Sequence, residues 1–215
     1  MIHDRKPSRT RGRPKGAADL QRIRLLQAAE HLLPGSQDEF SLRQVALRAE
    51  VTPPLAHYYF GNRDGLLRAL VSECATPRIE GLLTAARERA AKPVSALTRL
   101  MQRLTLLCAN DRFLRCCLLL PVGEPLRARL RVAMQELLHG AQATGQLRAD
   151  LSATYLADTL LGLCLFHFLD ARPGEDLGER AAALTLQHVA LLQDGIRPRV
   201  GAVLECPLPP ALPPA

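Results

Sequence analysis

Two consecutive prolines, Pro53 and Pro54, constrain the fold of this chain more than any other pair of residues. Proline inside a helix removes a hydrogen bond and clashes with the preceding turn, whereas at the first helical position its missing N–H is not needed. Thr52, which precedes the pair, is a favourable N-cap residue. We therefore expect a short helix that begins at Pro53 and ends near Phe60.

A second short helix is predicted directly before the prolines. Ser41 is a favourable N-cap residue, and Gln44 three residues later completes a capping box. Apolar residues then recur at helical spacing, at Leu42, Val45, Ala46 and Ala49. Glu50 and Val51 form the predicted turn, and Asn62 caps a third helix. Two short helices joined by a tight turn are typical of a DNA-binding helix-turn-helix, although a helical hairpin within an all-α core has the same spacing.

The amino-acid sequence of this segment resembles that of a known family. From residue 49 to 67 the chain reads AEVTPPLAHYYFGNRDGLL, which resembles the DNA-binding domain of TetR-family transcriptional regulators. The resemblance is specific over roughly residues 20 to 70 and architectural beyond them. Three residues depart from the family pattern: Glu50 stands where glycine is usual, Ala56 where a larger aliphatic residue is usual, and His57 where tyrosine is commoner.

The resemblance implies an N-terminal helix-turn-helix domain and a C-terminal domain that binds a ligand and dimerises. From residue 77 onward every pattern is helical, so we predict an all-α fold: an N-terminal three-helix helix-turn-helix DNA-binding domain followed by a helical ligand-binding/dimerisation domain. The last two long helices would pair with those of a second copy as a four-helix bundle. The predicted divisions are a basic arm at 1–18, the DNA-binding domain at 19–75, the effector-binding and dimerisation domain at 76–195, and a proline-rich disordered tail at 196–215.

Two helix boundaries are predicted within these divisions. The first helix should begin near Asp19 and bury Ile23, Leu26, Ala29 and Leu33. The helix capped by Asn62 should end near Cys74, and a separate helix should run from Arg78 to Ala91. The N-terminus has no signal-peptide pattern, and the longest apolar run, Leu160 to Leu169, is too short for a bilayer, so we expect a cytoplasmic protein.

Charge is concentrated at the N-terminus. Residues 1–24 contain eight Lys and Arg and two Asp, a net charge of +6 out of +7 for the whole chain. Such asymmetry indicates a polyanionic partner, and the lack of apolar residues in the arm argues against a membrane surface. Arg11-Gly12-Arg13-Pro14 resembles the core of an AT-hook, which runs extended along a narrow A·T minor groove. A solubilising tail is the alternative interpretation of the arm.

We predict contacts with double-stranded DNA from three groups of residues. Candidates for base or sugar contact lie on the helix that starts at the prolines: Thr52, Pro53, Leu55, His57 and Tyr58. Candidates for phosphate contact, which sets register without reading sequence, are Ser41, Arg43, Tyr59 and Arg63. The arm would add minor-groove contacts through Arg11 and Arg13. Packing within the domain is an equal alternative for His57 and Tyr58.

An unknown small-molecule effector would enter the core of the second domain. The flexible or bulky residues expected near it are Met101, Leu104, Cys108, Phe113, Cys117, Met134 and Phe166, although the same residues would fill a plain core. The six cysteines show no zinc-ligand spacing, so we predict no metal and no cofactor. Buried free thiols are the expected state, with a thiol-reactive effector as the alternative.

The function predicted from these features is that of a ligand-responsive, homodimeric and sequence-specific transcriptional regulator. We expect a repressor that a small molecule releases from a palindromic operator. One alternative is an architectural or nucleoid-associated DNA-binding protein without an effector, and another is a small-molecule-processing enzyme with a helical active site. The chain has no phosphate-binding loop, no nucleophile elbow and no His-Glu-x-x-His motif, so we predict that it is not an enzyme.

Overall fold

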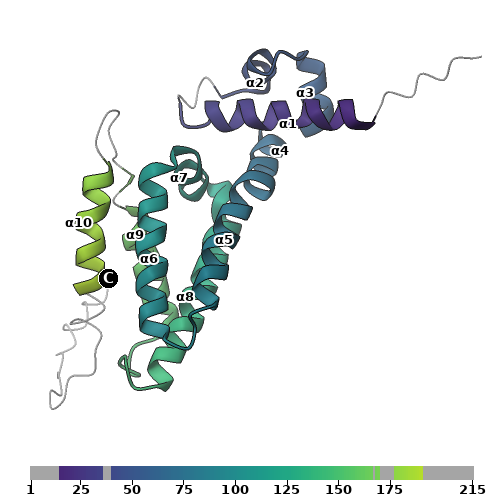
Figure 1. Cartoon of the computed structure of the whole chain (residues 1–215). Helices are drawn as coiled ribbons and strands as arrows, with labels where there is room; N and C mark the ends of the chain where they lie inside the picture. The colour runs from purple at the N-terminus through teal and green to yellow at the C-terminus, as the bar shows by residue number, and fades with distance from the viewer. Residues whose placement is uncertain (1–14, 36–39, 167, 170–176, 191–215) are drawn as a thin grey trace, which may run out of the picture.

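The computed structural model describes residues 15–35, 40–166, 168–169 and 177–190. All secondary structure within these ranges is helical, and they contain no strand. The predicted all-α fold is therefore confirmed. Figure 1 shows a small group of helices at the N-terminal end above a longer helical body. No described helix combines the length and apolar character needed to cross a membrane.

The N-terminal group packs around one long helix. Its elements are α1 (Lys15–Leu32), α2 (Leu42–Arg48), α3 (Pro53–Phe60) and α4 (Arg63–Ala69). α1 begins four residues before the expected Asp19. Its buried stripe is centred on Leu25 and Ala29 and continues to Leu33 just beyond the helix. Ile23 was expected in that stripe but is 48% exposed, because it lies beyond the stripe's edge on the helical wheel.

A single helical rod joins the N-terminal group to the body. α4 continues through a π-helical segment, η1 (Leu70–Ala75), into α5 (Thr76–Arg87). The predicted break between Cys74 and Arg78 was therefore wrong. The wider π-helical turn lets the helix continue through Pro77 without a break. Thr76, the residue before this proline, donates a 2.8 Å hydrogen bond from its hydroxyl to the Val71 carbonyl. Movement of the body can thus reach the N-terminal helices through continuous backbone.

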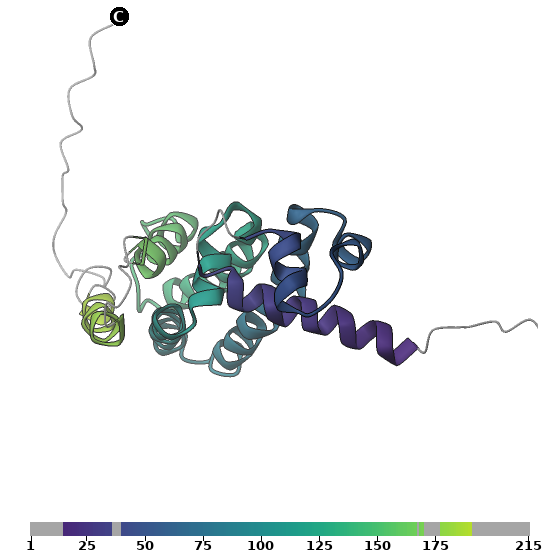
Figure 2. The ribbon, with the colours of Figure 1, turned by 90° about the horizontal axis from the view of Figure 1, so that it is seen from above.

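The body is built around α6. Its elements are α6 (Pro93–Asn110), α7 (Arg112–Leu119), the 3₁₀ turn η2 (Pro121–Gly123), α8 (Glu124–Ala143), α9 (Ala153–Phe166) and α10 (Leu177–Ala190). α5, α7, α8, α9 and α10 all pack against α6, and α8 also packs along α9. Seen from above in Figure 2, α10 lies at the edge of the body furthest from α1.

One arginine ties the N-terminal group to the body. Arg78 on α5 forms ion pairs with Glu30 on α1 and with Asp111, the residue that links α6 and α7. Its guanidinium also lies over the Phe113 ring, 5.0 Å from the centroid. Arg112 adds a second tie, because its side chain donates to the Pro34 carbonyl at 3.3 Å.

Candidate nucleic-acid interface

The turn between α2 and α3 is held in an unusual backbone conformation. At the start of α2, the Ser41 hydroxyl accepts a 3.3 Å hydrogen bond from the Gln44 N–H, which is the predicted cap. At its end, Glu50 has a φ of 56°, a left-handed conformation that favours glycine. The Val51 N–H donates to the Ala46 carbonyl at 3.0 Å and closes the turn. This φ gives the physical reason why glycine suits the position.

α3 starts at Pro53, as predicted, but Thr52 caps it differently from our expectation. The Thr52 side chain makes no capping hydrogen bond. Pro53 and Pro54 have no N–H to donate, and the first available donor, the Leu55 N–H, is bound at 3.0 Å by the Thr52 main-chain carbonyl. The Thr52 side chain is therefore exposed at the helix start rather than folded over it.

Most of the α3 surface is uncovered. Only Ala56 and Phe60 are buried in this eight-residue helix. Pro53, Leu55 and Tyr59 are half-buried, whereas Pro54, His57 and Tyr58 are exposed. Tyr58 has 80% of its surface accessible, the largest exposed fraction among the large hydrophobic side chains of the described residues. A large aromatic ring kept in water on a short rigid helix is typical of a contact surface.

Contacts with neighbouring residues fix the orientation of the His57 and Tyr58 side chains on the exposed side of α3. His57 Nδ1 donates to the Gly61 carbonyl at 2.9 Å, which orients the ring and leaves Nε2 on the outer side. The Tyr59 ring packs edge-on against Tyr58, with centroids 5.3 Å apart, and lies 6.2 Å from Phe60. His57 and Tyr58 thus contact neighbouring residues of the domain while remaining exposed, and Tyr59 is the partly buried ring.

The predicted phosphate-contact residues lie on different elements. Arg43 is exposed on α2. Arg63 starts α4; its Nε donates to the Phe40 carbonyl at 3.2 Å and its guanidinium lies 5.6 Å from the centroid of the Phe40 ring. Part of the Arg63 side chain therefore has a structural role. Arg11 and Arg13 lie outside the described residues.

Arg22 was not among the predicted site residues, yet it holds α3 in place. Arg22 of α1 forms an ion pair with Glu73 and lies 5.4 Å from the centroid of the Phe60 ring. The hydrogen bond from Arg22 holds the pKa of the Glu73 carboxyl below its usual value. Arg22 thus joins α1, the end of α3 and the π-helical segment.

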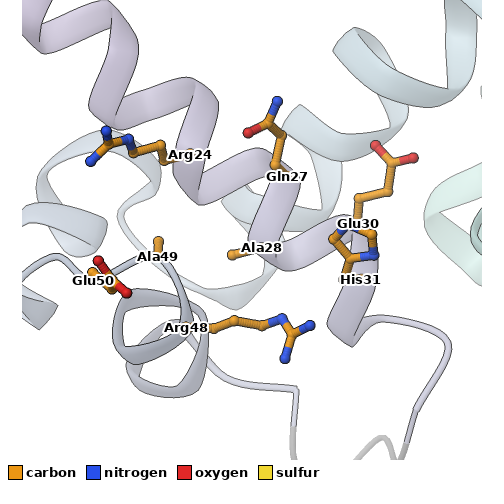
Figure 3. A pocket seen from close by; sticks show the side chains of 8 residues that line it. All are labelled: Arg24, Gln27, Ala28, Glu30, His31, Arg48, Ala49 and Glu50. Carbon is orange, nitrogen blue, oxygen red and sulfur yellow. The ribbon is translucent and has the colours of Figure 1, made fainter.

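A polar groove of about 690 Å³ lies between α1 and the C-terminal end of α2. Ala28 and Ala49 lie between its two walls, as Figure 3 shows. The remaining lining residues are Arg24, Gln27, Glu30, His31, Arg48 and Glu50. Sequence reasoning missed Arg24 and Arg48, because each occupies the polar side of its own helix and only packing of α1 on α2 brings them to one groove.

Most of the predicted effector residues belong to the hydrophobic core of the body. Six of them are buried: Met101, Leu104, Cys108, Phe113, Cys117 and Met134. The prediction for Phe166 was wrong, because this residue ends α9 with 64% of its surface exposed. An open groove of about 380 Å³ lies elsewhere, between α5 and α6.

The five described cysteines are free thiols, and burial makes three of them, Cys108, Cys117 and Cys164, poorly reactive. Burial raises the pKa of the Cys117 and Cys164 thiols to about 12, and it raises the pKa of Cys108 further. A thiol with such a pKa carries almost no thiolate at neutral pH. The described residues contain no group of three or more His, Cys, Asp or Glu side chains arranged to hold a metal ion.

Comparison with known proteins identifies the fold. No protein-family model and no curated sequence matches the chain. Among solved structures, a TetR-family transcriptional regulator from Pectobacterium atrosepticum superposes with a TM-score of 0.63 at 19% identity, covering 87% of this chain and 99% of its own. SmeT, the repressor of the Stenotrophomonas maltophilia multidrug efflux pump SmeDEF, gives 0.64 at 19% identity, with 89% and 97% covered.

A third structure agrees with these two. NalD, the secondary repressor of the MexAB-OprM multidrug efflux pump in Pseudomonas aeruginosa, superposes with a TM-score of 0.62 at 18% identity. It covers 80% of this chain and 96% of its own length. The chain therefore has the fold of TetR-family transcriptional regulators, as the helix-turn-helix residues predicted.

Proposed function

We propose that this chain is a TetR-family transcriptional regulator: a homodimer that binds a palindromic operator, represses transcription and leaves the operator when a small molecule binds. The observation that carries this proposal is the uncovered face of α3, with Tyr58 80% exposed. Only Ala56 and Phe60 of α3 are fully buried, and the exposed side of the helix, with Pro54, His57 and Tyr58, is available to a partner. A partner that accepts a narrow helix with ring, imidazole and hydroxyl groups is the DNA major groove.

Exposed cations on α1 and α2 would contact phosphates beside the DNA major groove. Arg43 of α2 is exposed, and Arg24 and Arg48 line the groove shown in Figure 3. Phosphate contacts of this kind position a protein without reading sequence, while Thr52, His57 and Tyr58 would meet base edges and sugars. The arm, with Arg11 and Arg13, would reach the adjacent minor groove.

Dimerisation would use the apolar surface of the last helices. Phe166 on α9 and Leu186 on α10 are 64% and 72% exposed, and Leu169 beyond α9 is also exposed. A second copy related by a two-fold axis would cover these side chains. The axis would place two α3 helices about 34–36 Å apart, or a multiple of that, which is why the operator should be palindromic.

The effector would act through the 76–195 domain on the 19–75 domain. The effector shifts the equilibrium between the DNA-binding conformation and the non-binding conformation only if it binds the non-binding conformation more tightly. A differential affinity of about 1–3 kcal/mol gives roughly 5- to 150-fold release. The helical rod from Arg63 to Arg87 and the ion pairs of Arg78 supply the physical connection.

Selection of bound sites from random duplexes tests the proposal. The full chain is mixed with random DNA at physiological salt, and bound duplexes are recovered and sequenced over several rounds. A recovered palindrome, bound about 10³-fold or more above non-specific DNA, supports a dimeric regulator. Enrichment of no sequence would contradict it and favour the architectural alternative, for which the strongly basic N-terminus is the supporting feature.

The arm is tested separately by the salt dependence of operator binding. Arg11→Ala with Arg13→Ala should lower the slope of log K against log salt by about one unit per lost phosphate contact. Arg197→Ala with Arg199→Ala removes the same charge from the C-terminal segment and should leave the slope unchanged. Equal slopes for the arm variant and the wild type would remove the arm from the proposed interface.

A further inference from the structure

The groove between α5 and α6 has the composition of a binding site for an amphipathic acid. It is lined by one face of each helix, with Arg78, Gly81 and Leu82 from α5 and Arg103, Leu106, Leu107 and Asn110 from α6. These residues recur at three- and four-residue intervals, so they lie in rows along the two packed helices. Its volume of about 380 Å³ falls within the range of small-molecule sites.

The walls of this groove are apolar and open to water. Leu106 is 44% exposed although α6 is the central helix of the body. Gly81 leaves further space, because a Cβ atom there would meet no atom within 4 Å. An apolar chain laid along Leu106 and Leu107 would remove leucine surface from water.

The charged groups that line this groove are all cations. Arg103 is exposed and makes no ion pair or hydrogen bond within the described part of the chain. Arg78 has two acidic partners, Glu30 and Asp111, which belong to other elements and do not line the groove. Arg103 can therefore meet a ligand carboxylate directly, whereas Arg78 would have to exchange one of its two acidic partners for it. A ligand with a cationic head would be repelled by Arg103.

We propose that this groove binds a monocarboxylate with an apolar chain, and that the bound carboxylate competes with Glu30 for Arg78. Loss of the Arg78–Glu30 ion pair would free the C-terminal part of α1 from the body. The assignment of this site as the effector site rests on the proposed function, whereas carboxylate binding itself does not require it.

Isothermal titration of the full chain with sodium decanoate, below its micelle concentration, tests the site. One decanoate should bind per chain, while 1-decanol and decyltrimethylammonium should each bind at least tenfold more weakly, since a charged hydrogen bond contributes about a factor of ten. Gly81→Phe fills the groove and should abolish binding. Thr84→Phe, an exposed position one turn further along α5, is the matched control and should bind as the wild type does.

A second pair of variants tests the contribution of the Arg103 charge to decanoate binding. Arg103→Leu should weaken decanoate binding about tenfold, and Arg99→Leu, one turn earlier on α6 and outside the groove lining, should not. Circular dichroism melting of each variant establishes that it is folded. Undiminished decanoate binding by Gly81→Phe, or equal binding of decanoate and decanol, would overturn the proposal.

Operator binding in the presence of decanoate separates the two proposals. If decanoate binds and weakens operator binding, the groove is the effector site, and Glu30→Gln should reduce the response to decanoate. If the operator is bound but decanoate is not, the groove proposal fails while the regulator stands. If decanoate binds in the groove but no duplex is preferred, the ligand site stands and the proposed function fails.

Discussion

Arg78 of α5 is bound to Glu30 of α1, two residues 48 positions apart in the sequence. The pair closes the junction between the DNA-binding helices and the body, and the same guanidinium holds Asp111 at 2.6 Å. About a third of the Arg78 side chain is exposed, and the two acids are exposed to 27% and 21%. Both carboxylates are therefore partly withdrawn from water and depend on one cation.

Removing this cation should destabilise the protein. Arg78→Met keeps an apolar stem over Phe113 but leaves Glu30 and Asp111 without their cation, although Asp111 still accepts the Leu114 N–H. We expect the free energy of unfolding to fall by about 2 kcal/mol, less than the 3–5 kcal/mol of a fully buried pair because solvent screens this one. Urea unfolding followed by circular dichroism measures it. Arg99→Met, at an exposed position on α6, should change the free energy by less than about 0.5 kcal/mol; equal effects of the two variants would contradict the bridging role.

Tyr58 should discriminate between DNA sequences without stabilising the fold. Tyr58→Ala removes an 80% exposed ring, so the free energy of unfolding should change by less than about 0.5 kcal/mol. The preference for the selected operator over random duplex should fall about tenfold or more, because one base contact contributes about 1–3 kcal/mol. Competition gel shifts measure this ratio. Val132→Ala truncates an exposed apolar side chain on α8, outside the proposed DNA and dimer surfaces, and should leave the ratio unchanged; an unchanged ratio in Tyr58→Ala would exclude base contact by this residue.

The local features of the helix-turn-helix could be predicted because short-range chemistry determines them. Ser41 and Asn62 each accept a hydrogen bond from the N–H three residues on, which requires no knowledge of the rest of the chain. The helix start at Pro53 follows from the missing proline donors alone. Such features depend on four or five neighbouring residues.

Features that depend on tertiary packing could not be predicted in this way. Pro77 was expected to separate two helices, but a π-helical turn carries the chain past it. Phe166 shares the apolar character of the core residues around it in sequence, and only the arrangement of α9 leaves it exposed. Arg24 and Arg48 are typical solvated residues of their own helices until α1 and α2 pack together.

Glu50 should be a site where a substitution stabilises the protein. Its φ of 56° costs about 1–2 kcal/mol for a residue with a Cβ atom, and glycine adopts it without that cost. Glu50→Gly should therefore raise the free energy of unfolding by about 1 kcal/mol, measured by urea unfolding. Glu50→Ala removes the same charge but keeps the Cβ atom, so it should give little gain. If both variants are stabilised equally, the gain comes from the charge and not from the backbone.

The buried thiol of Cys164 should make stability depend on pH in the alkaline range. Burial raises its pKa from the ordinary value of 9.0 to about 12 in the folded chain. Above pH 9 the unfolded chain releases this proton while the folded chain keeps it, so the free energy of unfolding falls as pH rises through the window from 9 to 12. The fall is about 1.4 kcal/mol per pH unit for one such thiol.

Cys164→Ala isolates this contribution from the other groups that titrate in the same range. Urea unfolding of the wild type and the variant between pH 8 and 10.5 should show a difference in unfolding free energy that is constant below pH 9. Above pH 9 it should shrink by about 2 kcal/mol, because only the wild type carries the buried thiol at this position. A difference that stays constant up to pH 10.5 would mean that Cys164 ionises in the folded chain as readily as in water. Thiol reagents could then reach Cys164 at neutral pH. The alternative that the effector is a thiol-reactive compound would have to be considered for this residue.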